Sequence, residues 1–97
     1  MTAIQAAREA LANGAQLVRL RKEQPDTGQY QYDVKPLFTG SHRHWTILDS
    51  FSASAIVAVH DRLNPINQAH FASLPLDRMA DWAFLCIARA QDRAKAS

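Results

Sequence analysis

The chain begins with a helical pattern of apolar and polar residues. Three apolar residues recur at the spacing of one helix face: Ile4, Ala7 and Leu11. Thr2 and Gln5 stand three residues apart and fit a capping box, which starts a helix. Gly14 can adopt the left-handed conformation in which many helices end. The pattern predicts a helix over residues 3–13.

The next segments alternate apolar and polar residues, which is the period of a β-strand. In residues 16–23, Val18 and Leu20 are expected on one face, with Arg19 and Arg21 on the other. Because alternating residues point to opposite sides of a sheet, this segment predicts one face turned to the core and one turned to water.

A second alternating segment follows at residues 29–35. Its apolar residues are expected to face the core: Tyr30, Tyr32 and Val34. Its polar residues are expected to face water: Gln29, Gln31, Asp33 and Lys35. The turn residues 25–28, Pro-Asp-Thr-Gly, join the two segments, so the pattern predicts a β-hairpin with one solvated face.

A third strand is predicted over residues 44–51. Trp45 and Ile47 would share one face, and we expect Trp45 to enter the core. On a strand, His42 and His44 would project from the same side, because the side-chain period is two. The economical arrangement of the three strands is an antiparallel meander.

The last half of the chain is helical in pattern and is divided twice by proline. Ser52 is the expected N-cap of the first of these helices, and Phe51 would pack on Ile56 as a hydrophobic staple. The buried stripe of this helix is Ile56, Val59 and Leu63. An Asn-Pro pair ends it and starts a short helix over residues 65–73. The short helix is expected to bury Ile66, Ala69 and Phe71.

A Leu-Pro pair precedes the longest predicted helix, over residues 75–93. One stripe of it is apolar: Leu76, Met79, Ala80, Ala83, Cys86, Ile87 and Ala90. Trp82, Phe84 and Leu85 widen this stripe beyond a normal amphipathic face. Trp82 and Phe84 stand two residues apart and so diverge by about 200°. The helix is therefore either central to the fold or presents an aromatic side chain to a partner or to a second copy of the chain.

These elements predict a single α+β domain over residues 1–97: an N-terminal helix, a three-stranded antiparallel meander and three C-terminal helices. The chain has 47% hydrophobic and 21% charged residues, which is ordinary for a globular domain. No apolar run reaches the ~18 residues of a membrane span, and the first segment is typical of an amphipathic helix rather than a signal peptide. The single cysteine excludes an internal disulfide, so we expect a reducing cytoplasm and no membrane.

Two histidines placed two residues apart, as His42 and His44 are, could chelate a divalent metal. A metal site needs further ligands, and the other candidates follow no short motif with ligand spacing: His60, Asp61, His70 and Cys86. We therefore expect no metal and no cofactor. The segment around the two histidines is interpreted as the polar rim of a hairpin, with a small metal-dependent activity as an alternative.

The motifs of nucleophilic and phosphate chemistry are absent from the sequence. There is no Gly-x-Ser-x-Gly nucleophile elbow and no glycine-rich phosphate loop. Cys86 stands in an apolar stripe, where a cysteine behaves as a small hydrophobe rather than as an activated thiolate. Asp77 and Asp81 lie near the start of a helix, where negative charge complements the helix dipole. We predict that the chain is not an enzyme.

Nucleic-acid binding has two possible carriers. A basic sheet face could follow phosphates: Arg19, Arg21, Lys35 and Arg43. Tyr30 and Tyr32 would point to the other side, so this face is expected to lack an aromatic stacking platform. The short helix 65–73 offers Asn67 and Gln68 for base edges but has no lysine or arginine for phosphates.

The second half of the chain also resembles a known group of proteins. The segments are FSASAIVAVHDRLN at residues 51–64, NQAHF at residues 67–71 and LPLDRMA at residues 74–80. They are similar to the C-terminal part of small uncharacterised proteins encoded by bacterial phages, prophages and plasmids. The resemblance implies a mobile-element accessory protein. Many such proteins bind host proteins stoichiometrically, and they include inhibitors of host defence such as anti-CRISPR proteins.

We therefore predict a non-enzymatic phage or mobile-element protein that binds a host protein or nucleoprotein complex, with inhibition of host defence as one form of that activity. The alternative is a nucleic-acid-binding or transcription-regulatory protein that uses the basic sheet face. A homodimer is compatible with either prediction. The residues predicted to contact a partner are Arg19, Arg21, Lys35, His42, Arg43, His44, Trp82 and Phe84.

Overall fold

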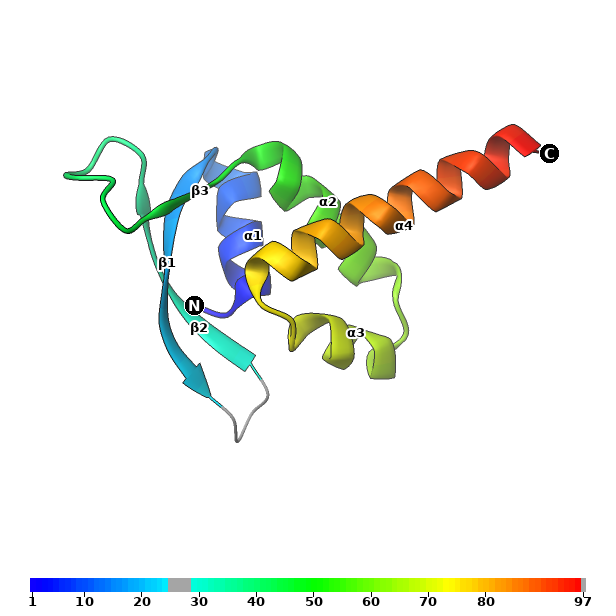
Figure 1. Ribbon diagram of the computed structural model, residues 1–97, viewed down its shortest axis with the longest axis horizontal. Helices are drawn as coiled ribbons and strands as arrows, with labels where there is room; N and C mark the ends of the chain where they lie inside the picture. Colours follow the sequence, from blue (N-terminus) through cyan, green and yellow to red (C-terminus); the bar gives the residue numbers. More distant parts are fainter. Residues whose placement is uncertain (25–28, 97) are drawn as a thin grey trace.

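Over residues 1–24 and 29–96, which the computed structural model describes, the chain forms a three-stranded antiparallel sheet and four helices (Figure 1). In chain order the elements are α1 (Ala3–Asn13), β1 (Gln16–Gln24), β2 (Gln29–Pro36), β3 (Thr46–Leu48), α2 (Ser50–Arg62), α3 (Pro65–Ala72) and α4 (Leu76–Ala96). The predicted α+β class, with a helix before the sheet and three helices after it, is confirmed. The turn predicted at residues 25–28 lies outside the described residues.

The strand order is β2-β1-β3, so β3 pairs with β1 rather than with β2. This order differs from the predicted meander, in which each strand pairs with its neighbour in sequence. The start of the chain occupies the outer edge of β2. There the Tyr32 N–H donates to the Met1 carbonyl at 2.7 Å, and Thr2 forms a bridge with Gln31. β3 therefore pairs with the other edge of β1.

β3 is shorter than the strand predicted over residues 44–51, since it spans only Thr46–Leu48. His44 has a φ of 65°, in the left-handed region where an extended strand cannot continue. The Trp45 N–H donates to the His42 carbonyl at 3.0 Å and closes a turn. The prediction that His42 and His44 project from one side of a strand is therefore wrong.

The core lies where α1, α2 and α4 meet one face of the sheet. Ile56 of α2 and Met79 of α4 are fully buried, and Val18 and Tyr32 face them from the sheet as predicted. The Tyr32 hydroxyl accepts a hydrogen bond from the Leu76 N–H at 2.9 Å, which ties the start of α4 to β2. α1 contributes only small buried side chains: Ala3, Ala6, Ala7 and Ala10. Small side chains allow α1 to pack closely against α2 and the sheet.

Two predicted helix starts are confirmed. Thr2 and Gln5 form the capping box of α1: the Gln5 N–H donates to Thr2 Oγ1 at 3.2 Å, and the Thr2 N–H donates to Gln5 Oε1 at 2.9 Å. Asn64 caps α3 by accepting the Asn67 N–H at 2.9 Å, and Pro65 takes the first helical position.

The start of α2 differs from the prediction. The N-cap is Asp49, whose carboxylate accepts the Ser52 N–H at 2.6 Å, and this hydrogen bond lowers the pKa of the Asp49 carboxyl. The predicted cap at Ser52 and the staple between Phe51 and Ile56 are therefore wrong. Phe51 lies in the first turn of α2, is 75% exposed and stacks on Phe84 with 5.5 Å between ring centroids.

α3 buries one side only. Phe71 is 5% exposed, whereas Ile66 is 72% exposed and Ala69 is also exposed. The prediction that α3 buries Ile66 and Ala69 is wrong for a geometric reason. Ile66 precedes Phe71 by five residues and Ala69 precedes it by two, which turns them about 140° and 160° away on a helix.

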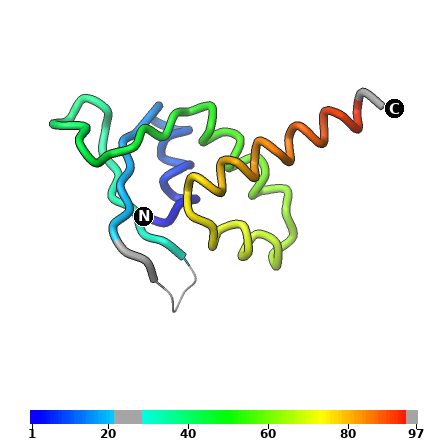
Figure 2. Tube along the Cα trace, viewed as in Figure 1, coloured from blue at the N-terminus to red at the C-terminus, as the bar shows by residue number. Residues whose placement is uncertain are grey.

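α4 is longer than the predicted helix 75–93, since it continues to Ala96. Its first half packs on the rest of the chain, where Leu76, Met79 and Ala83 are buried. Its second half extends away from the other elements (Figures 1 and 2), and residues 88–93 are exposed on every side of the helix. The two halves of this helix therefore have different environments.

Candidate binding surfaces

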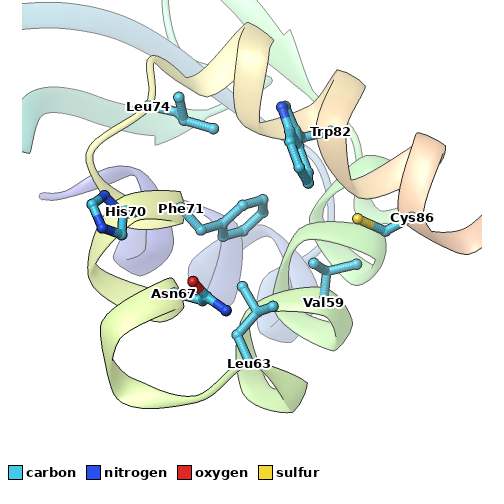
Figure 3. Close-up of a pocket in the computed structure, with 8 residues that line it drawn as sticks. All are labelled: Val59, Leu63, Asn67, His70, Phe71, Leu74, Trp82 and Cys86. Carbon is cyan, nitrogen blue, oxygen red and sulfur yellow. The ribbon is translucent and has the colours of Figure 1, made fainter.

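An apolar groove of about 310 Å³ opens between α2, α3 and α4 (Figure 3). Its lining comes from all three helices and from the two loops that join them: Val59, Leu63, Asn67, His70, Phe71, Leu74, Trp82 and Cys86. Figure 3 shows Trp82 and Cys86 projecting from α4 over the side of the groove that Phe71 approaches from α3. Phe71 is buried, whereas Trp82 stands at the rim with 53% of its surface exposed.

The position of α3 against α2 follows from the Asn-Pro pair between them and from two side-chain contacts. The Asn-Pro pair turns the chain between them, and the Gln68 side chain then donates to the His60 carbonyl at 2.9 Å. The His60 ring lies against Phe71 with 6.4 Å between ring centroids. These contacts hold α3 to the end of α2, so the remaining wall of the groove is α4.

Trp82 and Phe84 lie on different sides of α4, as the sequence predicts. Phe84 is partly buried and stacks with Phe51, so much of its ring already has a partner within the chain. Trp82 borders the groove and exposes more than half of its surface. The structure thus does not bring the two predicted partner-contacting aromatics together, and Trp82 is the more available of the two.

Sequence reasoning missed the polar residues at the groove and one apolar residue on α4. Asn67 and His70 line the groove with exposed side chains, although the sequence indicated Asn67 only as a reader of base edges. Leu85 is 45% exposed on the side of α4 away from the core. Periodicity could not reveal Asn67 and His70, because the groove depends on how three helices are placed around it.

The second surface is the face of the sheet opposite the core. Trp45 lies across it, with the Arg19 guanidinium carbon 4.5 Å and the Lys35 Nζ 4.3 Å from the ring centroid. Leu17 shares this face of β1 with Arg19 and is fully buried. The prediction that Trp45 enters the core is therefore wrong. The turn at His44 ends the strand, and the tryptophan lies over the basic face instead.

This arrangement also overturns the expectation that the basic face lacks an aromatic platform. Its cations, however, already have partners. The Asp33 carboxylate pairs with Arg19 at 3.1 Å and with Arg21 at 3.8 Å, and the Lys35 ammonium donates to the Ser41 carbonyl at 3.1 Å. Arg19, Arg21, Lys35 and Trp45 are brought together as one surface, which the Asp33 carboxylate partly neutralises.

The loop after β2 places the other predicted contact residues. The His42 Nε2 lies 2.7 Å from the Leu37 carbonyl, and the Arg43 N–H donates to the Ser41 hydroxyl at 3.1 Å. His42, Arg43 and His44 are all exposed. They form a polar rim beside the basic face, as predicted, but on an irregular loop rather than on a strand.

His60 and Asp61 take part in the contact between α1 and α2. Asp61 accepts two hydrogen bonds from the Arg8 guanidinium, at 2.6 and 3.4 Å, and lies 3.1 Å from the His60 ring. These contacts, that with Arg8 first, lower the pKa of the Asp61 carboxyl. They join α1 to α2. Within residues 1–24 and 29–96, no three His, Cys, Asp or Glu side chains are grouped so that they could hold a metal ion.

None of the described helices combines the length and the apolar character that crossing a membrane requires. Comparison with protein-family models found no match. Comparisons with curated proteins and with solved structures likewise found none that was significant.

Proposed function

We propose that this chain is a non-catalytic protein-binding domain that docks an apolar segment of its partner in the groove between α2, α3 and α4. The observation that supports it is Trp82, 53% exposed at the rim of an apolar groove. Tryptophan is enriched among the residues that dominate binding energy, since it offers a large apolar ring and one hydrogen-bond donor.

The dimensions of the groove suggest the kind of segment that fits. About 310 Å³ accommodates one or two bulky side chains rather than a whole element. An amphipathic helix that inserts an apolar anchor into a groove between helices is a recurring mode of recognition. The exposed side chains of Asn67 and His70 offer hydrogen bonds to the polar edge of such a segment.

The identity of the partner remains a prediction from the sequence. The segments that resemble phage, prophage and plasmid proteins lie in α2, α3 and the start of α4, which are elements that border the groove. A host protein, alone or within a nucleoprotein complex, is therefore the partner that this proposal favours. Inhibition of a host defence system would be one consequence of such binding.

The two tryptophans of the chain provide matched variants for the test. The tagged chain is incubated with bacterial host lysate with and without nuclease, and the recovered proteins are quantified by mass spectrometry. The proposal predicts a nuclease-resistant protein that is recovered by wild type and Trp45→Ala and lost from Trp82→Ala. Recovery that Trp82→Ala leaves unchanged would contradict it.

A second candidate function has its own observation. Trp45 lies over Arg19 and Lys35 on the sheet face, which combines an aromatic ring with cations. Proteins that bind single-stranded nucleic acid combine such stacking with phosphate contacts. This candidate predicts salt-dependent binding of single-stranded oligonucleotides that Trp45→Ala weakens and Trp82→Ala does not. Binding unaffected by Trp45→Ala would exclude the sheet face.

A further inference from the structure

The outer face of α4 points away from the rest of the chain. Leu85 stands nine residues after the buried Leu76 and two after the buried Ala83, so it lies about 180° and 160° from them around the helix. Among residues 76–94 of this helix, those within about 80° of Leu85 are all exposed: Asp77, Arg78, Asp81, Trp82, Ala88, Arg89, Asp92 and Arg93. No element of the described chain packs over this face.

The charges on this face are arranged with opposite signs about Leu85. Asp81 stands four residues before Leu85 and Arg89 four after it. Arg78 stands seven before it and Asp92 seven after it. Asp77 and Arg93 repeat the relation at eight residues. No ion pair joins any of these six side chains to another described residue.

We propose that the outer face of α4 binds the same face of a second copy of the chain, with the two helices antiparallel and crossing at Leu85. In this arrangement Leu85 meets Leu85 of the second copy. Asp81 and Arg78 then face Arg89 and Asp92 of the second copy, respectively. A two-fold axis repeats each pair, so the charges that stand at the same level across the interface have opposite signs.

The shape of the molecule permits this pairing. The second half of α4 extends clear of the other elements (Figures 1 and 2), so another helix can lie along it without meeting them. In an antiparallel pair, each extended half lies beside the first half of the other helix, while the remaining elements stay on the two outer sides. The pairing also gives tertiary support to residues 88–93, which are exposed throughout, and helices gain most of their stability from such support.

The orientation follows from the charges. A parallel pair in register would place Asp81 opposite Asp81 and Arg89 opposite Arg89, which repel. A lipid surface would favour a single sign of charge, whereas residues 77–93 of this face carry three aspartates and three arginines. The inference goes beyond the proposed function, because it concerns a second copy of the chain. Of the groove residues on α4, Cys86 lies about 100° from Leu85 around the helix, whereas Trp82 lies about 60° from it, so the dimer would cover part of Trp82.

The test is sedimentation equilibrium of the purified chain at low ionic strength, over loading concentrations from about 10 µM to about 1 mM, because a pair of single helices is a small interface. We expect a monomer–dimer equilibrium that weakens as salt is added. Asp81→Arg and Arg89→Asp should each raise the dimer Kd at least about tenfold, since each sets like charges against one another.

The two charge variants also test the pairing when they are mixed. An equimolar mixture of Asp81→Arg and Arg89→Asp restores opposite charges at both contacts, so it should form a heterodimer while each variant alone stays monomeric. Circular dichroism confirms that both variants are folded. A wild type that is monomeric at every concentration would overturn the proposal, and so would a dimer that the two substitutions leave unchanged.

Discussion

The two tryptophans lie in opposite situations. Trp45 covers the outer face of the sheet and already contacts Arg19 and Lys35 at 4.5 and 4.3 Å. Trp82 borders the groove on α4 with 53% of its surface exposed and contacts no such cation within the described residues. An aromatic side chain whose contacts are made within the chain stabilises the fold, whereas one left exposed beside a groove retains surface that a partner can bury.

The outer face of the sheet therefore has contacts within the chain for its tryptophan, whereas the groove leaves its tryptophan largely without them. On the sheet, the Asp33 carboxylate pairs with Arg19 and Arg21. Lys35 donates a hydrogen bond to the loop that follows β2. At the groove, Asn67 and His70 are exposed, whereas Phe71 is buried. We consequently propose the groove as the main binding surface, and the following variants test that proposal.

The largest effect is expected at the floor of the groove. Phe71→Ala removes a ring that is 5% exposed, and the cavity left behind should lower the free energy of unfolding by about 3 kcal/mol. Urea denaturation measures the change. Ile66→Ala on the same helix is the control, since Ile66 is 72% exposed and should cost less than about 0.5 kcal/mol. Equal losses in the two variants would show that α3 does not pack through Phe71.

Replacing Trp45 should destabilise the fold more than replacing Trp82 does, whereas replacing Trp82 should weaken binding to the partner more. Trp45→Ala loses a partly buried ring and two cation contacts, so it should cost about 2 kcal/mol. Trp82→Ala should cost less than about 1 kcal/mol, because its ring is mostly in water. Thermal and urea unfolding of the two variants would reveal the difference, and the reverse order would contradict the comparison.

A smaller effect is expected at the bond between the sheet and α4. Tyr32→Phe removes the hydroxyl that accepts the Leu76 N–H and should cost about 1 kcal/mol at neutral pH. Burial raises the pKa of the Tyr32 hydroxyl above its ordinary value of 10.0. The folded protein thus keeps this proton at a pH where the unfolded chain has lost it, so the contribution is complete below pH 10.0 and declines above it.

The pH dependence provides the measurement for Tyr32. As the pH rises above about 10, wild type should lose stability more steeply than Tyr32→Phe, because only wild type has the buried hydroxyl. Urea midpoints at neutral and alkaline pH compare the two slopes. Parallel slopes would mean that Tyr32 ionises as freely in the fold as in the unfolded chain.

The smallest change in stability is expected at Asp33. Asp33→Asn weakens two exposed ion pairs and should alter the free energy of unfolding by less than about 0.5 kcal/mol. It also releases Arg19 and Arg21. If the sheet face binds single-stranded nucleic acid, the affinity should rise and its dependence on salt should steepen. Glu9→Gln is the control, because it makes the same charge change on α1; an equal gain there would indicate an effect of net charge alone.

The sequence was informative where local chemistry decides the structure. The capping box of Thr2 and Gln5, the Asn-Pro start of α3 and the alternation of Tyr30, Tyr32 and Val34 each depend on neighbours in the chain, and each is found in the structure. The fold class follows from these elements. The exposure of Trp82 was one of two outcomes that the spacing on α4 left open.

The sequence was not informative where distant segments compete for one position. The strand order depends on Met1 and Thr2 occupying the edge of β2, which no local pattern reveals. The placement of Trp45 depends on the turn at His44, whose positive φ is uncommon for any residue other than glycine. The groove needs α2, α3 and α4 in place together, so its polar residues could not be found from periodicity.

The most direct test of the central claim is the affinity of Trp82→Ala for the partner recovered with the wild-type chain. Isothermal titration compares wild type, Trp82→Ala and Trp45→Ala under one salt condition. The account predicts that Trp82→Ala weakens binding about 30-fold or more, as loss of a dominant interface residue does, while Trp45→Ala binds as wild type. A partner that binds Trp82→Ala as tightly as wild type would show that the groove is not its binding site.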